Sequence, residues 1–103
     1  MMNVKVMTER EQETIIRVND DIRVAQDSLL DDELLYDEDN FELNRATEAL
    51  LYGAYNDDIG YVMKGLDILK EFTQRVEGFE TKDYGFNDYI DTLQKVINRH
   101  IKR

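Results

Sequence analysis

Carboxylates are the most abundant side chains in this 103-residue sequence that could do chemistry. The chain holds 23 Asp and Glu against 13 Lys and Arg, which gives a formal net charge of −10. Paired carboxylates bind calcium in helix–loop–helix sites, but the two best spacings each lack a required residue. A loop counted from Asp37 has Glu42 where a glycine must form the sharp turn, and a loop counted from Asp83 has Gln94 in place of the bidentate glutamate. The spacing therefore predicts no calcium site.

Residues for nucleophilic or metal-assisted catalysis are few. The sequence has no cysteine, which excludes disulfides, thiolate zinc sites and cysteine nucleophiles. The one serine, Ser28, has no histidine in its sequence context. The one histidine, His100, follows Ile97 where a di-metal bundle needs a glutamate, and we expect it to be a solvated residue near the C-terminus. Carboxylate pairs of the glycosidase type stay open because acids are abundant, but we expect no enzyme, no cofactor and no metal site.

The acidic excess is concentrated in one stretch of the chain. Residues 20–42 hold ten acids and one base, Arg23, whereas the rest of the chain is nearly neutral. On a helix, carboxylates four residues apart, such as those of Asp27 and Asp31, lie about 6 Å apart along the axis, close to the spacing of phosphates along a nucleic-acid strand. A groove lined with Lys and Arg for DNA or RNA would therefore attract this stretch. The predicted partner-binding residues are Asp27, Asp31, Asp32, Glu33, Asp37, Glu38 and Asp39.

The leading hypothesis is a small acidic inhibitor or regulator that binds a basic, nucleic-acid-handling protein, partly by nucleic-acid mimicry. By size and charge alone, the chain is analogous to phage or mobile-element proteins that mimic DNA or inhibit CRISPR effectors. The same electrostatics would suit an immunity-type protein that neutralises a basic toxin. An acidic face that only keeps a small bundle soluble is the plainest alternative. Without clustered Lys and Arg, the chain is not expected to bind nucleic acid or an anionic membrane directly.

The first helix that must position these acids follows from apolar spacing. The absence of proline permits long helices, and apolar residues from Ile15 to Leu29 recur in steps of three and four. Thr8 and Glu11 have the spacing of a capping box, in which each side chain accepts from the other's backbone N–H. Together these signals predict a helix over residues 8–30.

A second and a third helix are predicted over residues 40–55 and 58–77. Asp39 suits the N-cap of the second helix, with Glu42 at its third position. Gly78 follows the third helix where a C-terminal glycine belongs. No glycine or proline forces a break between the two, so one fused helix is the alternative. A fused helix would need a second chain to cover its apolar seam.

Residues 86–101 are predicted to form a fourth helix, with cations near its C-terminus that favour the helix dipole. Residues 1–7 are interpreted as an N-terminal arm, in which Asn3–Met7 alternate weakly like a strand that a dimer could exchange. The predicted fold class is all-α, a single domain (residues 1–103) built as a small antiparallel bundle of three to four helices, with dimerisation left open. No apolar run approaches 18 residues and no secretory signal is recognisable, so a cytoplasmic protein is expected.

The predicted helical hairpin carries two further patterns. Residues 46–71 resemble a degenerate tetratricopeptide helix pair in a small residue after an aromatic and in the Lys-Gly-Leu-Asp sequence. The 34-residue period does not recur, and a generic helical hairpin explains the same residues. Tyr52, Tyr55 and Tyr61 surround the turn beside two aspartates, where they would cap the core or receive a partner's arginines.

The second hypothesis for function is a helical homodimer with a structural or adaptor role and no catalysis. In that arrangement the apolar seams of the first and third helices meet across two chains, and the acids only keep the protein soluble.

Overall fold

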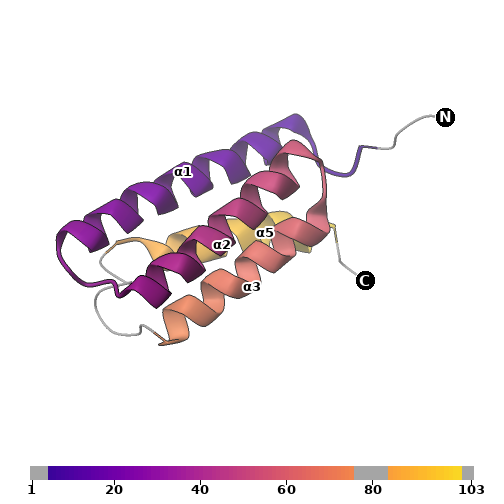
Figure 1. Ribbon diagram of the computed structural model, residues 1–103. Coiled ribbons are helices and arrows are strands. Elements are labelled where there is room, and N and C mark those ends of the chain that lie inside the picture. Colours follow the sequence, from indigo (N-terminus) through magenta and orange to yellow (C-terminus); the bar gives the residue numbers. More distant parts are fainter. Residues whose placement is uncertain (1–4, 76–83, 101–103) are drawn as a thin grey trace.

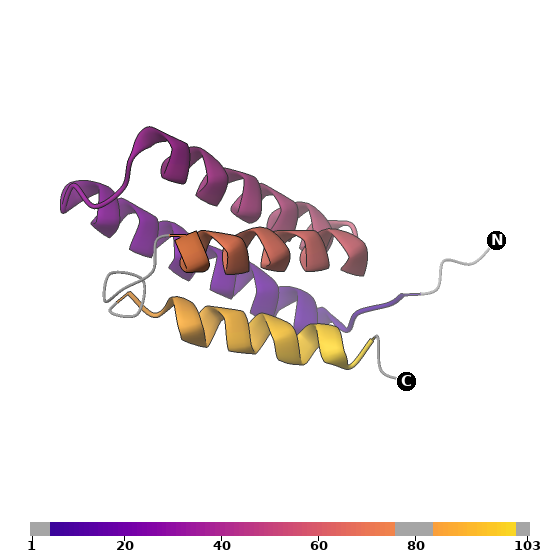
Figure 2. The ribbon, with the colours of Figure 1, turned by 90° about the horizontal axis from the view of Figure 1, so that it is seen from below.

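Four helices form the part of the chain that is described by the computed structural model, residues 5–75 and 84–100. They are α1 (Glu9–Asp31), α2 (Asp37–Tyr55), α3 (Ile59–Arg75) and α5 (Phe86–Asn98). The helices run alternately up and down, α1 and α3 both pack against α2 and α5, and Figures 1 and 2 show this arrangement from two sides. The predicted all-α helical bundle is confirmed.

Helix α1 begins with the capping box that the sequence indicated. The backbone N–H of Glu11 donates to Thr8 Oγ1 at 3.0 Å, and the backbone N–H of Thr8 donates to Glu11 Oε1 at 2.9 Å. These reciprocal bonds satisfy two of the N–H groups that a helix leaves free at its start. The capping box therefore fixes the start of α1. The C-terminal end of α1 places the acidic stretch at the opposite end of the bundle.

Helix α2 begins earlier than predicted, and the assignment of Asp39 as its N-cap is wrong. The N-cap is Tyr36, and Asp39 lies in the first turn, where its Oδ2 accepts from the backbone N–H of Tyr36 at 3.4 Å. Asp37 and Glu38 occupy the same turn, where negative charge is favoured by the helix dipole. The connection between the predicted helices 8–30 and 40–55 is therefore shorter than expected, because three acids stabilise one further helical turn.

Helices α2 and α3 are separate, so the fused-helix alternative is wrong. Asp57 has φ +54°, a left-handed conformation that ends the helical path. Asp58 Oδ1 then accepts from the backbone N–H of Gly60 at 3.0 Å at the start of α3. Gly53 lets the two helices approach closely, since a Cβ atom there would lie 2.6 Å from Val62 Cγ2.

The predicted C-terminal ends of the third and fourth helices can be compared with the structure only in part, because some of their residues lie outside the described ranges. Helix α3 is described to Arg75, and the proposed terminal Gly78 lies outside the described residues, as does residue 101. Helix α5 ends at Asn98 instead, with a turn over residues 99–100. Gly85 precedes α5 with φ +86°, a conformation that favours glycine.

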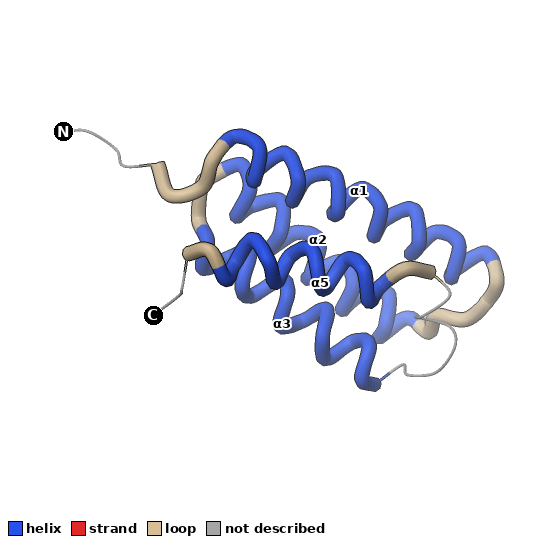
Figure 3. The backbone as a smooth tube through the Cα atoms, turned by 180° about the vertical axis from the view of Figure 1, so that it is seen from behind, coloured by secondary structure: helices blue, strands red, loops and turns tan. Residues whose placement is uncertain are grey.

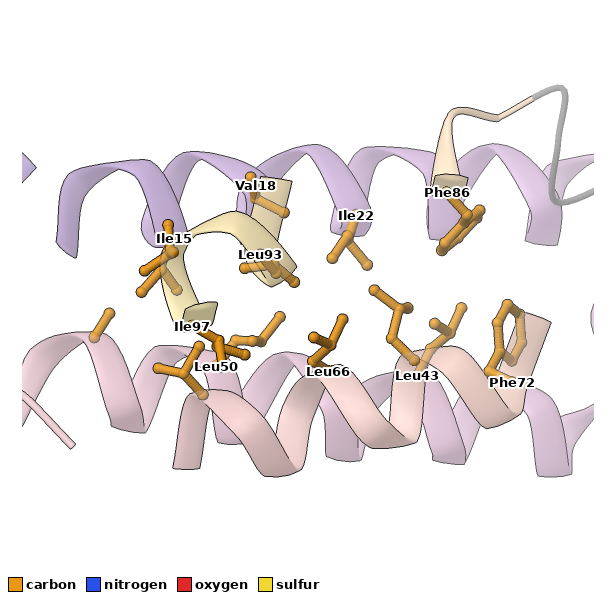
Figure 4. Close-up of a cluster of buried hydrophobic side chains, with 14 of the residues drawn as sticks. Ile15, Val18, Ile22, Leu43, Leu50, Leu66, Phe72, Phe86, Leu93 and Ile97 are labelled. Carbon is orange, nitrogen blue, oxygen red and sulfur yellow. The ribbon is translucent and has the colours of Figure 1, made fainter. Parts of the chain in front are cut away.

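The apolar seams of α1 and α3 lie in the core of the single chain. Figure 4 shows side chains from all four helices meeting in the interior of the bundle. The Phe72 and Phe86 rings pack there with centroids 5.6 Å apart. Because Ile15 and Ile22 of α1 and Leu66 of α3 are buried there, these seams offer no face to another chain. The structure of the single chain therefore gives no support to a homodimer formed through the seams of the first and third helices.

The described part of the N-terminal arm packs against its own chain. Met7 is buried in the core, and the backbone N–H groups of Val6 and Met7 each donate to the Asp57 carboxylate at 2.7 Å. Burial opposes ionisation of Asp57, but these two hydrogen bonds outweigh it and lower its pKa. Residues 5–7 are thereby fixed to the turn between α2 and α3. The first part of the proposed exchanging strand, Asn3 and Val4, lies outside the described residues.

Candidate functional site: the acidic end of the bundle

The structure brings the seven predicted partner-binding residues to one end of the bundle. They come from the last turns of α1, the connecting loop and the first turn of α2, which adjoin one another in Figures 1 and 3. Six are exposed, and we call these six the acidic end: Asp27, Asp31, Asp32, Glu33, Asp37 and Glu38.

Asp39, the seventh, is buried and does not belong to the exposed surface. Its Oδ1 lies 2.7 Å from Nη2 of Arg75 at the end of α3, and Arg75 also pairs with Glu42. These two carboxylates raise the pKa of Arg75. Asp39 therefore joins α2 to α3, a role that the sequence did not reveal because its partner stands 36 residues later.

The connecting loop is held in a Schellman motif, the usual hydrogen-bonded end of an α-helix. The backbone N–H of Glu33 donates to Leu30 O at 3.0 Å, and that of Leu34 donates to Leu29 O at 2.9 Å. Glu33 occupies the left-handed position of this motif, with φ +60°, where glycine is preferred. A glutamate here carries a backbone cost that a glycine would avoid.

The charges at the end of α1 also oppose the helix dipole. A helix C-terminus carries partial negative charge and favours cations, but the last turn of α1 contains no basic residue and ends on Asp31. Asp27 stands one turn earlier on the same side, and two like charges at this spacing repel each other. Packing and capping therefore do not explain why this end of α1 is acidic.

The loop is also fixed to the last helix by a side-chain contact. The Tyr84 hydroxyl, just before α5, donates a hydrogen bond to Oδ2 of Asp32. Asp32 remains exposed, so this contact positions its carboxylate without removing it from solvent. The geometry of the acidic end is therefore set by the hydrogen bonds of the Schellman motif and by the contact between Tyr84 and Asp32.

Two apolar side chains stand exposed among these carboxylates. Tyr36, in the loop, is 81% exposed, and Leu30, in the last turn of α1, is 40% exposed. Tyrosine is enriched in protein–protein interfaces, and an exposed ring between charges gains contact area when a partner covers it. The acidic end thus has a composition that suits a protein partner better than solvent alone.

Outside the acidic end, the titratable side chains include a cluster around Glu11. No three side chains among His, Asp and Glu in residues 5–75 and 84–100 are placed to hold a metal ion together. The expectation that His100 is solvated is wrong, since its ring is mostly buried and Nε2 lies 3.0 Å from Glu11 Oε1. The sequence missed this contact because 89 residues separate the two partners.

Comparisons with protein-family models, with curated proteins and with solved structures found no match to this chain. Among the described residues, none of the helices has the length and apolar character needed to cross a bilayer. The function of the acidic end is therefore argued from its own geometry and charge.

Proposed function

We propose that this protein is a small acidic inhibitor or regulator that docks its acidic end on the basic, nucleic-acid-binding surface of another protein. The observation that carries this proposal is that six exposed carboxylates gather at one end although several oppose stability. Glu33 occupies a left-handed position and Asp31 ends a helix whose dipole disfavours it. Strain and unfavourable charge retained at one exposed place are typical of functional sites.

The binding would depend on long-range attraction and on release of counterions. A surface lined with Lys and Arg attracts a compact anionic end over several ångströms, and each ion pair that forms releases ions into solution. Asp27 and Asp31 reproduce a spacing of about 6 Å along α1. Tyr36, in the loop between Glu33 and Asp37, would add apolar contact area to the anionic surface. Binding should accordingly weaken steeply as salt increases.

The test compares two variants with the same change in charge. The first reverses Asp31, Asp32 and Glu33 to lysine. The matched control reverses three exposed acids away from the acidic end, namely Glu13 near the start of α1, Asp67 of α3 and Asp91 of α5. Each immobilised protein is incubated with a lysate of its source organism at low and high salt, with and without duplex DNA as a competitor. Circular dichroism checks that both variants keep their helices.

The expected result is a nucleic-acid-binding protein that the wild type and the control variant retain at low salt. The acidic-end variant should lose this protein, and both duplex DNA and high salt should release it. Equal retention by the two variants, or retention that duplex DNA does not reduce, would contradict the proposal.

A further inference from the structure

The exposed aromatic side chains of this protein are not scattered over its surface. Among the described residues, the exposed aromatics lie on α2, at its N-cap, or in contact with it. Phe41 is 66% exposed, Tyr52 is 50% and Tyr55 is 70%. Tyr61 of α3 packs against Tyr52, with ring centroids 4.3 Å apart. Exposed aromatic rings gathered in this way do not stabilise a monomer. Such a cluster is typical of a protein–protein interface.

Three of these aromatics, Phe41, Tyr52 and Tyr55, belong to one stripe along the outer face of α2. Its residues are separated by 3, 4, 3, 4 and 3 positions, the spacing of a helix face that packs against another helix. The opposite face of α2 is buried in the core through Leu43 and Leu50, so the stripe faces away from its own chain. We call these residues the α2 stripe: Glu38, Phe41, Arg45, Glu48, Tyr52 and Tyr55.

We propose that the α2 stripe is a self-association surface that binds a second copy of this chain, with the two α2 helices antiparallel. The order of side chains along the stripe is self-complementary about a point midway between Arg45 and Glu48. A two-fold axis at that level places Arg45 opposite the second copy's Glu48, and Phe41 opposite the second copy's Tyr52. Each contact then occurs twice, as an isologous interface requires.

The charges of the stripe favour this partner and this orientation. Within the described part of the chain, neither Arg45 nor Glu48 forms an ion pair with its own chain, so both are free to pair across the axis. A parallel arrangement would bring the two acidic ends together. In the antiparallel arrangement they lie at opposite ends of α2, about 28 Å apart along a 19-residue helix, which reduces repulsion between two chains of charge −10.

A groove beside the stripe can receive the phenyl ring of the second copy's Phe41. It has a volume of about 280 Å³ and lies between α2 and α3, where Tyr52, Tyr61, Lys64 and Ile68 are among its lining residues. Lys64 Nζ lies 5.8 Å from the centre of the Tyr61 ring, so the lysine side chain lies beside the aromatic residues that line the groove. A dry cavity of about 150 Å³ already admits a benzene ring, so this space is large enough for the proposed contact.

The decisive experiment measures association of two charge-reversed variants, alone and mixed. The Arg45→Glu variant carries carboxylates at both central positions, and the Glu48→Arg variant carries cations at both. Each alone should dimerise about tenfold more weakly than the wild type, because two attractive pairs become repulsive. An equimolar mixture should form a one-to-one heterodimer at near wild-type affinity, measured by sedimentation equilibrium. As matched controls, Arg17→Glu on α1 and Asp91→Arg on α5 should leave the dimer unchanged.

A second pair of variants tests the aromatic contact. Phe41→Ala should weaken the dimer about tenfold or more, whereas Tyr36→Ala, which removes an exposed ring outside the stripe, should not. A wild-type protein that stays monomeric up to about 0.5 mM would overturn the proposal and assign the stripe to a different protein. Dimers unaffected by Phe41→Ala, or a mixture that forms no heterodimer, would overturn it equally.

This inference does not depend on the proposed function of the acidic end. Reversal of Asp31, Asp32 and Glu33 to lysine should abolish capture of a nucleic-acid-binding protein and leave the dimer intact.

Discussion

Nε2 of His100 lies 3.0 Å from Oε1 of Glu11, and this contact joins the end of the last helix to the first turn of the first. Arg99 Nη1 approaches the other carboxylate oxygen of Glu11 at 3.0 Å, while the same Oε1 accepts from the backbone N–H of Thr8. One buried carboxylate therefore caps α1 and fixes α5 beside it. Burial opposes its ionisation, but the hydrogen bonds and the nearby cations prevail and lower the pKa of Glu11.

The first prediction concerns Glu11→Gln, which removes the charge that faces Arg99 and His100. At pH 7 we expect the free energy of unfolding to fall by about 1–3 kcal/mol. A carboxylate with a lowered folded pKa stabilises above its unfolded pKa, here 4.5, and loses that contribution as the pH falls through the folded pKa. Urea denaturation of both proteins at pH 7 and pH 3 should therefore show a difference that shrinks in acid. An equal difference at both pH values would contradict this account.

The second prediction separates backbone strain from charge at Glu33. Glu33→Gly should raise the free energy of unfolding by about 1 kcal/mol, because glycine adopts a positive φ without a steric cost. Glu33→Ala removes the same charge but keeps the strain, so it should stabilise less. Urea denaturation of the three proteins measures both effects. If alanine proved as stable as glycine, charge alone would account for the cost.

The third prediction contrasts two glycines of the α2–α3 hairpin. A Cβ atom at Gly53 would meet backbone atoms, Asp58 O and Val62 N, each at 2.8 Å, and these cannot move without displacing α3. Gly53→Ala should therefore lower the free energy of unfolding by about 2–4 kcal/mol. Gly60→Ala serves as the control, since its nearest atom is Asp58 Oδ1 at 3.2 Å and alanine favours a helix. Its melting temperature should fall far less than that of Gly53→Ala, because only one side-chain oxygen must shift.

The fourth prediction concerns Asn19, which is fully buried in α1. Among the described residues, its amide oxygen and nitrogen have no hydrogen-bond partner. Gln12 and Gln26, seven residues to either side, both bond to groups of α2. Asn19→Leu should raise the free energy of unfolding by about 1–2 kcal/mol, since it removes two unsatisfied polar groups from the interior. A lower urea midpoint would show that the amide finds a partner in solution.

Much of the fold could be predicted from the sequence because the signals for single helices are local. The capping box joins Thr8 to Glu11 within one turn, and the apolar residues from Ile15 to Leu29 recur at the helical period regardless of what covers them. The place of the candidate site could be predicted for the same reason. Acids adjacent in the chain remain adjacent when a short loop joins two antiparallel helices.

What the sequence by itself determined, then, is a set of amphipathic helices and the concentration of charge near one of their connections. Only the tertiary structure decided which acids are free, because Asp39 meets Arg75 and Glu11 meets His100 across dozens of residues. It also decided that the seams of α1 and α3 are buried in one core shared with α2 and α5, while the outer face of α2 stays exposed. The physical reason is that spacing along the chain fixes a helix and its faces, whereas the choice of which faces meet depends on packing among all the helices at once.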